Sequence, residues 1–312
     1  MKATESLLMT ELASFMDRCL CLDLETGPDG TILALGAALG EETVLQKHRA
    51  SVKGALDQVH EMAGRARFLL GHNLLDHDLP VIEARFPQSP LLRMPVVDTL
   101  YLSPLAFPEN PYHRLVKDYK LVRDSLNDPL ADARLAASLF SDQWEALTAA
   151  EVRESGRLSF YHHAFSGSGG YRGIQQALEA MGAASVEGRE AVGIFEGLSR
   201  GRVCTKALKE TVPGCLEDPG QRVSLAYVLA WIGVAGGNSV LPPWVGRRFP
   251  LVATLLRALR DVPCGDSGCA YCGEAHDPEK QLRRFFGFSG FRAEPAEPRG
   301  RSLQRAVVTR AL

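Results

Sequence analysis

Residues 19–27 read CLCLDLETG and place two acidic side chains inside an apolar run. The apolar residues are typical of a strand that is buried on both faces. Because side chains alternate along a strand, Asp23 and Glu25 are expected on the same face, about 7 Å apart. Two carboxylates on a buried strand repel each other, and an oxygen-preferring divalent cation would compensate this repulsion. The alternative is that the strand ends at Leu24 and both acids face water at its tip.

Composition excludes several classes of protein. The chain has 312 residues, 46% of them hydrophobic, which is enough for a substantial core and for two domains. The net charge of −2 gives no overall signature of nucleic-acid binding, so any such surface must be local. The longest apolar run, VSLAYVLAWIGVAGG, has 15 residues and predicts a buried helix, and the first residues lack a signal-peptide pattern. We therefore expect a cytoplasmic protein with no membrane partner.

The chain divides into four regions by pattern. Residues 1–148 alternate apolar strands with helical stretches, which predicts an α/β domain with strands near 18–26, 32–40, 66–73 and 95–102 and a helix starting at Asp128 and Pro129. Residues 149–262 are mainly helical in pattern. A cysteine-rich segment (263–280) and a segment rich in Phe and Arg (281–312) follow.

Further acids in the first region complete a possible metal site. Asp76 and Asp78 occur in LLGHNLLDHDLPVI, and Asp132 lies one turn after Asp128 on the expected helix. A carboxylate pair on a strand with one acid from each of two later elements is the set that a two-metal phosphodiester hydrolase requires.

These motifs resemble the DEDD (DnaQ-like) superfamily of 3′→5′ exonucleases, whose fold is ribonuclease-H-like. LDLETG, GHNLLDHDLP and NDPLADARLA occur in the family's order, which is more specific than any one of them. The resemblance implies that Asp23, Glu25, Asp78 and Asp132 bind two Mg²⁺ or Mn²⁺ ions. Asn73 with Asp78 fits the second motif best, and Asp76 is the alternative for its acid.

The general base of this superfamily is not at its usual place. Members carry a His five residues before the last Asp, or a Tyr four before it, and here these positions hold Asn127 and Asp128. Asn127 cannot accept a proton, so catalysis would be weak or altered, with a cation alone lowering the pKa of water. His77 and His113 are possible substitutes, although each is more simply a polar loop residue. Asp98 resembles a structural strand-end acid of this fold.

A second constellation is CGDSGCAYCGEAH. Cys264, Cys269, Cys272 and His276 have the spacing C-x4-C-x2-C-x3-H, which predicts a closed structural Zn²⁺ site. A 4Fe–4S cluster is the alternative, and its fourth thiolate would come from Cys204 or Cys215. Free thiols are a third possibility, and Cys19 and Cys21 are expected to be core residues.

The C-terminal segment resembles the start of the helicase core in RecQ-family DNA helicases. Phe286, Gly287, Phe291, Arg292 and Gln304 follow that family's order, with a longer spacer before the Gln. The resemblance makes Phe291, Arg292 and Gln304 candidate nucleotide contacts. Taken alone, this stretch also fits a core helix with a charged face. No Walker A sequence occurs, so we expect the helicase core, and ATP binding, only in a longer full-length chain.

Two functions follow as hypotheses. The first is a metal-dependent 3′→5′ exonuclease acting on single-stranded DNA or 3′ ends, joined to a helicase in DNA repair. The second is a catalytically weak or inactive module that binds DNA 3′ ends. RNA as substrate, and defence against foreign DNA, remain open. Basic residues in the middle region fit either a DNA path or, more simply, solvated helix faces.

Overall fold

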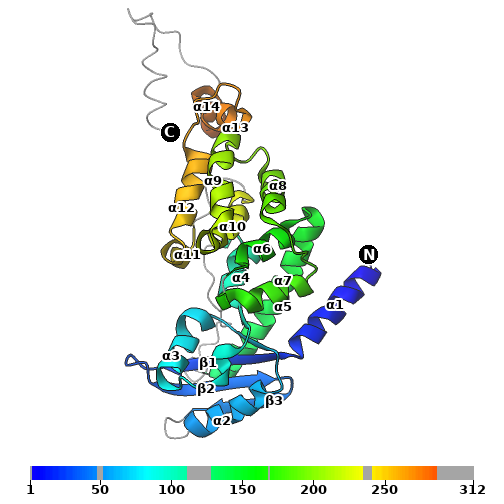
Figure 1. Cartoon of the computed structure of the whole chain (residues 1–312), viewed down its shortest axis with the longest axis vertical. Helices are drawn as coiled ribbons and strands as arrows, with labels where there is room; N and C mark the ends of the chain where they lie inside the picture. Colours follow the sequence, from blue (N-terminus) through cyan, green and yellow to red (C-terminus); the bar gives the residue numbers. More distant parts are fainter. Residues whose placement is uncertain (1, 48–51, 111–127, 168, 235–240, 287–312) are drawn as a thin grey trace, which may run out of the picture.

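A computed structural model of the chain describes residues 2–47, 52–110, 128–167, 169–234 and 241–286 (Figure 1). In these residues one mixed sheet of five strands has the order β3-β2-β1-β4-β5. β1 pairs antiparallel with β2, and β2 antiparallel with β3, whereas β1–β4 and β4–β5 are parallel. The strands are β1 (Cys19–Thr26), β2 (Ile32–Leu39), β3 (Glu42–Gln46), β4 (Phe68–Gly71) and β5 (Val96–Asp98).

Alternation along β1 divides the core into two layers. Leu20, Leu22 and Leu24 belong to one apolar cluster, whereas Cys19 and Cys21 belong to another. The first layer lies under α2 (Val52–Ala63), the π-helix Leu74–Asp78, α3 (Leu79–Arg85) and the 3-10 helix Pro90–Arg93. The second lies under α1 (Lys2–Met16), α4 (Thr99–Ala106) and α5 (Pro129–Arg153). Asp23 and Glu25 share the parity of Cys19 and Cys21, so β1 presents them toward the α5 layer.

The first turn of α5 lies directly on β2. Asp128 is the N-cap, and its side chain accepts hydrogen bonds from the N–H groups of Leu130 and Ala131, both at 3.2 Å. Pro129 occupies the first turn, where its missing N–H costs nothing. A Cβ added to Gly36 on β2 would lie only 2.1 Å from the backbone N of Leu130. The close approach of helix and strand therefore requires glycine at this position.

The rest of the described chain is helical. It contains α6 (Arg157–Phe165), the 3-10 helix Gly169–Tyr171, α7 (Arg172–Ala180), α8 (Gly188–Ser199), α9 (Thr205–Glu217), α10 (Pro219–Ile232), α11 (Pro243–Arg248), α12 (Leu251–Leu256), the π-helix Arg257–Asp261, α13 (Ala270–Ala275) and α14 (Pro278–Phe286). The helices extend away from the sheet, with α13 and α14 at the far end (Figure 1). The larger apolar cluster continues from the sheet into these helices. The boundary expected after residue 148 lies inside α5, which carries the core across it.

The coarse expectations agree with this architecture. The chain is α/β with a mostly helical remainder, α5 starts after Asp128, and residues 223–232 of the long apolar run lie in the buried α10. The sequence pattern does not predict α1 or the edge strand β3, in which only Val44 is buried. None of the helices in the described ranges has both the length and the apolar character needed to span a bilayer.

We expect Gly36→Ala to destabilise the protein by about 1–3 kcal/mol or more, because the new methyl group overlaps backbone atoms of Pro129 and Leu130 that cannot rotate away. Urea unfolding of both proteins measures the change. Gly54→Ala on α2 is the matched control, since a Cβ there meets no atom within 4 Å of it, and helix propensity predicts a neutral or stabilising effect. Equal stabilities for the two variants would contradict the proposed role of Gly36.

Candidate functional site

Three acids come together at the contact between β1 and α5. Carboxylate oxygens of Asp23, Glu25 and Asp132 lie within 4.8 Å of one another. Asp23 and Glu25 are partly buried, and Asp132 is 9% exposed. β1 supplies the pair through alternation. Because Gly36 is the β2 partner of Asp23, the approach of α5 to Gly36 brings Asp132 over the same point of the sheet.

Asp78 lies beside this group but is not one of the three converging acids. Its carboxylate accepts a hydrogen bond from the backbone N–H of Leu24 at 2.9 Å, and it is 2% exposed. Burial raises the pKa of Asp78 well above its usual range, and the charge of Asp23 raises it further. A cation held near Asp23 would oppose both effects. Asp78 is thus electrostatically linked to the group through β1.

The loop before Asp78 is held by the buried Asp98. Asn73 has φ 68°, a left-handed conformation that Asn tolerates better than most residues. Asp98 accepts hydrogen bonds from the N–H groups of Asn73 (2.8 Å), Leu75 (3.0 Å) and Leu100 (3.0 Å). Burial raises the pKa of Asp98 to about 6. These contacts support the structural role expected for Asp98, and they place Asn73 as part of the turn that leads to Asp78.

Asp76, the alternative to Asp78, points elsewhere. It accepts a hydrogen bond from the Tyr101 hydroxyl at 2.7 Å and forms an ion pair with Arg248 at 3.5 Å. His77 contacts Thr26 through its Nε2 at 3.1 Å, next to the end of β1. The structure therefore brings Asp78, and not Asp76, to the strand that carries the acid pair.

The residues expected near the general base are only partly described. Asn127 and His113 lie outside the described residues. Asp128 is fully engaged as the N-cap of α5 and forms an ion pair with Lys47 at 3.3 Å. Hydrogen bonds from the α5 backbone and the Lys47 charge lower the pKa of Asp128 despite partial burial. Asp128 is therefore a poor proton acceptor for a reaction at neutral pH.

A second candidate metal centre consists of four cysteines. Sulfurs of Cys204, Cys264, Cys269 and Cys272 lie within 4.8 Å of one another. Cys204 is the N-cap of α9, and Cys269 is the N-cap of α13. Cys272 lies in the first turn of α13. Gly265, with φ 73°, permits the turn after Cys264. The backbone N–H of Cys204 donates to the carbonyl of Leu259 at 2.8 Å, which fixes the start of α9 beside the segment that leads to Cys264.

The fourth member corrects the expected ligand set. The sequence spacing predicts His276, but the structure brings Cys204 to the three clustered cysteines, and His276 is not in the group. His276 ends α13, donates its backbone N–H to the carbonyl of Cys272 at 3.0 Å, and packs edge-on against Tyr271. The spacing predicts Cys204 only as a possible fourth ligand of an iron–sulfur cluster, because spacing reveals ligands that are close in sequence and a long helical region separates Cys204 from Cys264.

Electrostatics in the cysteine group favour anionic sulfur at one position. The pKa of Cys269 is lowered to about 7, first because the backbone N–H of Cys272 donates to its sulfur. Desolvation by burial raises the pKa of Cys204 and of Cys272. A bound cation would favour the thiolate form of all four sulfurs, so metal binding would release protons.

The candidate nucleotide contacts Phe291, Arg292 and Gln304 lie outside the described residues. Another polar and aromatic cluster, Tyr161, His162 and His163, lies buried on α6 and has structural partners. His162 contacts Glu179 at 2.9 Å, and His163 contacts the carbonyl of Val186 at 2.9 Å.

Comparison with protein-family models, with curated proteins and with solved structures found no match for this chain. Functional conclusions therefore depend on the two residue groups and their surroundings.

We expect Cys204→Ser to lose metal bound by the cysteine group, because removing one of four thiolates opens the coordination shell. His276→Ala should retain the metal. Cys215→Ser is the control for loss of a buried cysteine outside the group, since the Cys215 sulfur interacts with Gln221. Metal content per chain, measured after desalting, checks all three variants. Metal loss in His276→Ala with retention in Cys204→Ser would restore the Cys3His set.

Proposed function

We propose that the chain is a metal-dependent 3′→5′ exonuclease that acts on DNA ends. The observation that supports this most directly is the convergence of Asp23, Glu25 and Asp132 within 4.8 Å, from one strand and one helix. Asp78, the fourth acid of the resemblance, contacts the same strand at Leu24. An α/β architecture with a mixed sheet is compatible with the ribonuclease-H-like fold that the resemblance implies.

The chemistry of the donor set fits hard divalent cations. Carboxylate oxygens are the ligands that Mg²⁺ and Mn²⁺ prefer, and the partial burial of Asp23 and Glu25 limits competition from water. Two such ions would supply charge that activates water and stabilises the leaving 3′ oxygen. In this proposal Asp23, Glu25 and Asp132 hold the cations. Asp78 holds the β1 backbone at Leu24 and adds negative charge beside Asp23.

DNA is the proposed substrate because of the C-terminal resemblance. The segment with Phe291, Arg292 and Gln304 is similar to the start of a RecQ-like helicase core, which would expose DNA ends for the exonuclease. RNA is the competing substrate, and a direct comparison of labelled strands separates the two.

A second candidate function is a catalytically weak module that binds DNA 3′ ends. It is favoured by the surroundings of the expected base, since Asn127 cannot take a proton and Asp128 is engaged by the α5 backbone and Lys47. Such a module would use the same acids and cations to hold a 3′ end without cleaving it.

We expect Asp132→Asn to lower the rate of degradation of 5′-labelled single-stranded DNA by about 100-fold or more, because a neutral amide weakens the cation site. Asp142→Asn on the exposed face of the same helix is the control and should keep the parental rate. The assay uses Mg²⁺ or Mn²⁺, and its ladder of products gives the polarity. Metal-dependent binding of the 3′ end without cleavage by the parent protein would favour the second function.

We also propose that the cysteine group binds a single Zn²⁺ ion. Zinc–sulfur bonds of about 2.3 Å in a tetrahedron place sulfurs about 3.8 Å apart. A 4Fe–4S cluster separates its four cysteine sulfurs more widely, by roughly 6 Å. The sulfurs of Cys204 and Cys269 are 4.0 Å apart, and the whole group lies within 4.8 Å. The spacing of the sulfurs thus fits one tetrahedral ion.

The purified protein is therefore expected to contain zinc and to lack the broad absorption near about 400 nm that is typical of iron–sulfur proteins. Replacement of zinc by Co²⁺ should give the visible bands of tetrahedral thiolate coordination, and these bands should change in Cys204→Ser. Anaerobic purification is required, since oxygen destroys exposed clusters. Iron and inorganic sulfide in stoichiometric amounts would contradict the zinc proposal.

A further inference from the structure

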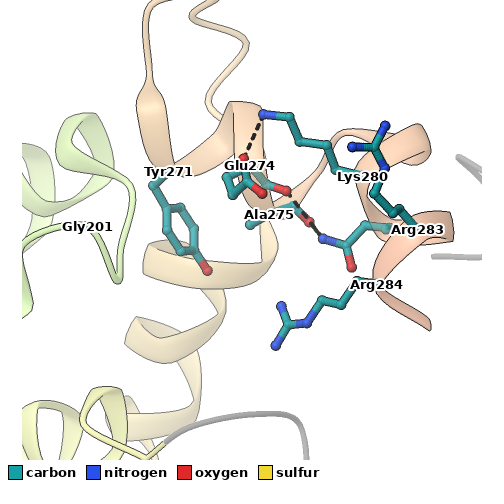
Figure 2. Close-up of a pocket in the computed structure, with 8 residues that line it drawn as sticks. Gly201, Tyr271, Glu274, Ala275, Lys280, Arg283 and Arg284 are labelled. Carbon is teal, nitrogen blue, oxygen red and sulfur yellow. Dashed lines mark hydrogen bonds and ion pairs between the residues drawn. The ribbon is translucent and has the colours of Figure 1, made fainter. Parts of the chain in front are cut away.

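A hollow of about 470 Å³ lies between the turn at Gly201 and helices α13 and α14 (Figure 2). Its lining contains Tyr271 and Glu274 on one side and a basic group on α14. A smaller hollow of about 270 Å³ adjoins the same turn and is lined in part by Arg200 and Lys209. Gly201 lines both, so the two hollows meet at this turn.

The charge of this surface differs from that of the whole protein. The chain has a net charge of −2. The two linings together carry five cationic and two acidic side chains: Arg200, Lys209, Lys280, Arg283 and Arg284 against Glu196 and Glu274. Glu274 is already paired with Lys280 at 2.6 Å. The surface thus has a local excess of positive charge, which attracts polyanions.

Local hydrogen bonds fix the walls of the larger hollow. Gln281 donates to the carbonyl of Ala275 at 2.7 Å, and Lys280 donates to the carbonyl of Gly273 at 3.1 Å, which together hold α14 against α13. The Tyr271 hydroxyl donates to the carbonyl of Arg260 at 3.1 Å. Its ring is therefore held in one orientation where it lines the hollow.

The cysteine group connects the two walls. Cys204 follows Gly201 closely in sequence, on one wall. On the other wall, Cys269 is the N-cap of α13 and Cys272 lies in this helix. A metal ion that binds these sulfurs would fix the separation of the walls. A structural metal site thus has a local consequence, namely the shape of the basic hollows.

We propose that these two hollows form a binding surface for the phosphate backbone of a single nucleic-acid strand. A strand carries regularly spaced negative charges, and the adjoining hollows carry cations on both sides of Gly201. The aromatic ring of Tyr271 is suited to contact a base, as in other surfaces that bind single strands. The helices α13 and α14 lie at the opposite end of the molecule from the strands of the sheet (Figure 1). The surface can therefore bind the strand without taking part in hydrolysis.

Fluorescence anisotropy with a labelled thymidine oligonucleotide tests the proposal. The full chain carries Asp132→Asn and the buffer contains Ca²⁺, so binding is measured without cleavage and separately from any failure of the exonuclease. The test variant is Arg283→Glu with Arg284→Glu. The matched control is Lys53→Glu with Arg93→Glu, which makes the same change in net charge at exposed positions in the sheet region.

The α14 variant is expected to bind at least tenfold more weakly at about 100 mM salt. In a plot of the logarithm of the binding constant against the logarithm of the salt concentration, the slope for this variant should be shallower by about 1.4, because two phosphate contacts are lost. The control should remain within twofold of the parent. Arg200→Glu with Lys209→Glu should weaken binding similarly. Because these residues line the smaller hollow, this variant tests the surface even if the substitutions on α14 disturb the packing of that helix. Unchanged binding in both surface variants, equal weakening in the control, or equally effective displacement by polyglutamate would overturn the proposal.

Discussion

The contact between the first turn of α5 and the backbone of Gly36 determines the geometry around the acids. At this point the helix approaches the sheet so closely that no side chain fits between them. The same helix then crosses the expected domain boundary and contributes Phe140, Trp144 and Leu147 to the core shared with the helical region. Because Gly36 has no side chain, α5 can pack at this point, and this packing sets both the position of Asp132 over β1 and the direction in which the helical region leaves the sheet.

Much of this arrangement could be predicted because it follows from local rules. The apolar run predicted a strand at 18–26, and the structure has it at Cys19–Thr26. Alternation along this strand predicted the shared face of Asp23 and Glu25, and a capping residue with proline predicted where α5 begins. The turn GPDG between 18–26 and 32–40 predicts that these two strands are neighbours, as β1 and β2 are. The parallel pairing of β1 with β4 and the approach of α5 to Gly36 involve residues far apart in sequence, so no local pattern reveals them. The edge strand β3 was missed because only one of its side chains is buried, which leaves little periodic signal.

The cysteine group shows the same limit in another form. Three cysteines within nine residues predicted a metal site, and the structure brings their three sulfurs together as soft ligands. The spacing predicted His276 as the fourth ligand, because it is close in sequence to the three cysteines. In the structure the fourth member is Cys204, whose backbone N–H donates a hydrogen bond to the carbonyl of Leu259 and so holds the start of α9 beside the group. Ligands contributed by a distant element are selected by tertiary packing. A metal bound by Cys204 and the three clustered cysteines would join the start of α9 to the cysteine-rich loop, whereas a metal bound only within that loop would stabilise the loop alone.

Electrostatic magnitudes show why the acid group is suited to bind a cation. Two charges within 4.8 Å repel each other by about 3.5 kcal/mol or more at an effective dielectric constant near 20. The group contains three such pairs, and the buried Asp78 adds to them. The N-terminal dipole of α5 offsets only about 0.3–1 kcal/mol for an acid in its first turns. The helix dipole therefore offsets only part of this repulsion, and a divalent cation bound by the three carboxylates would offset much more of it.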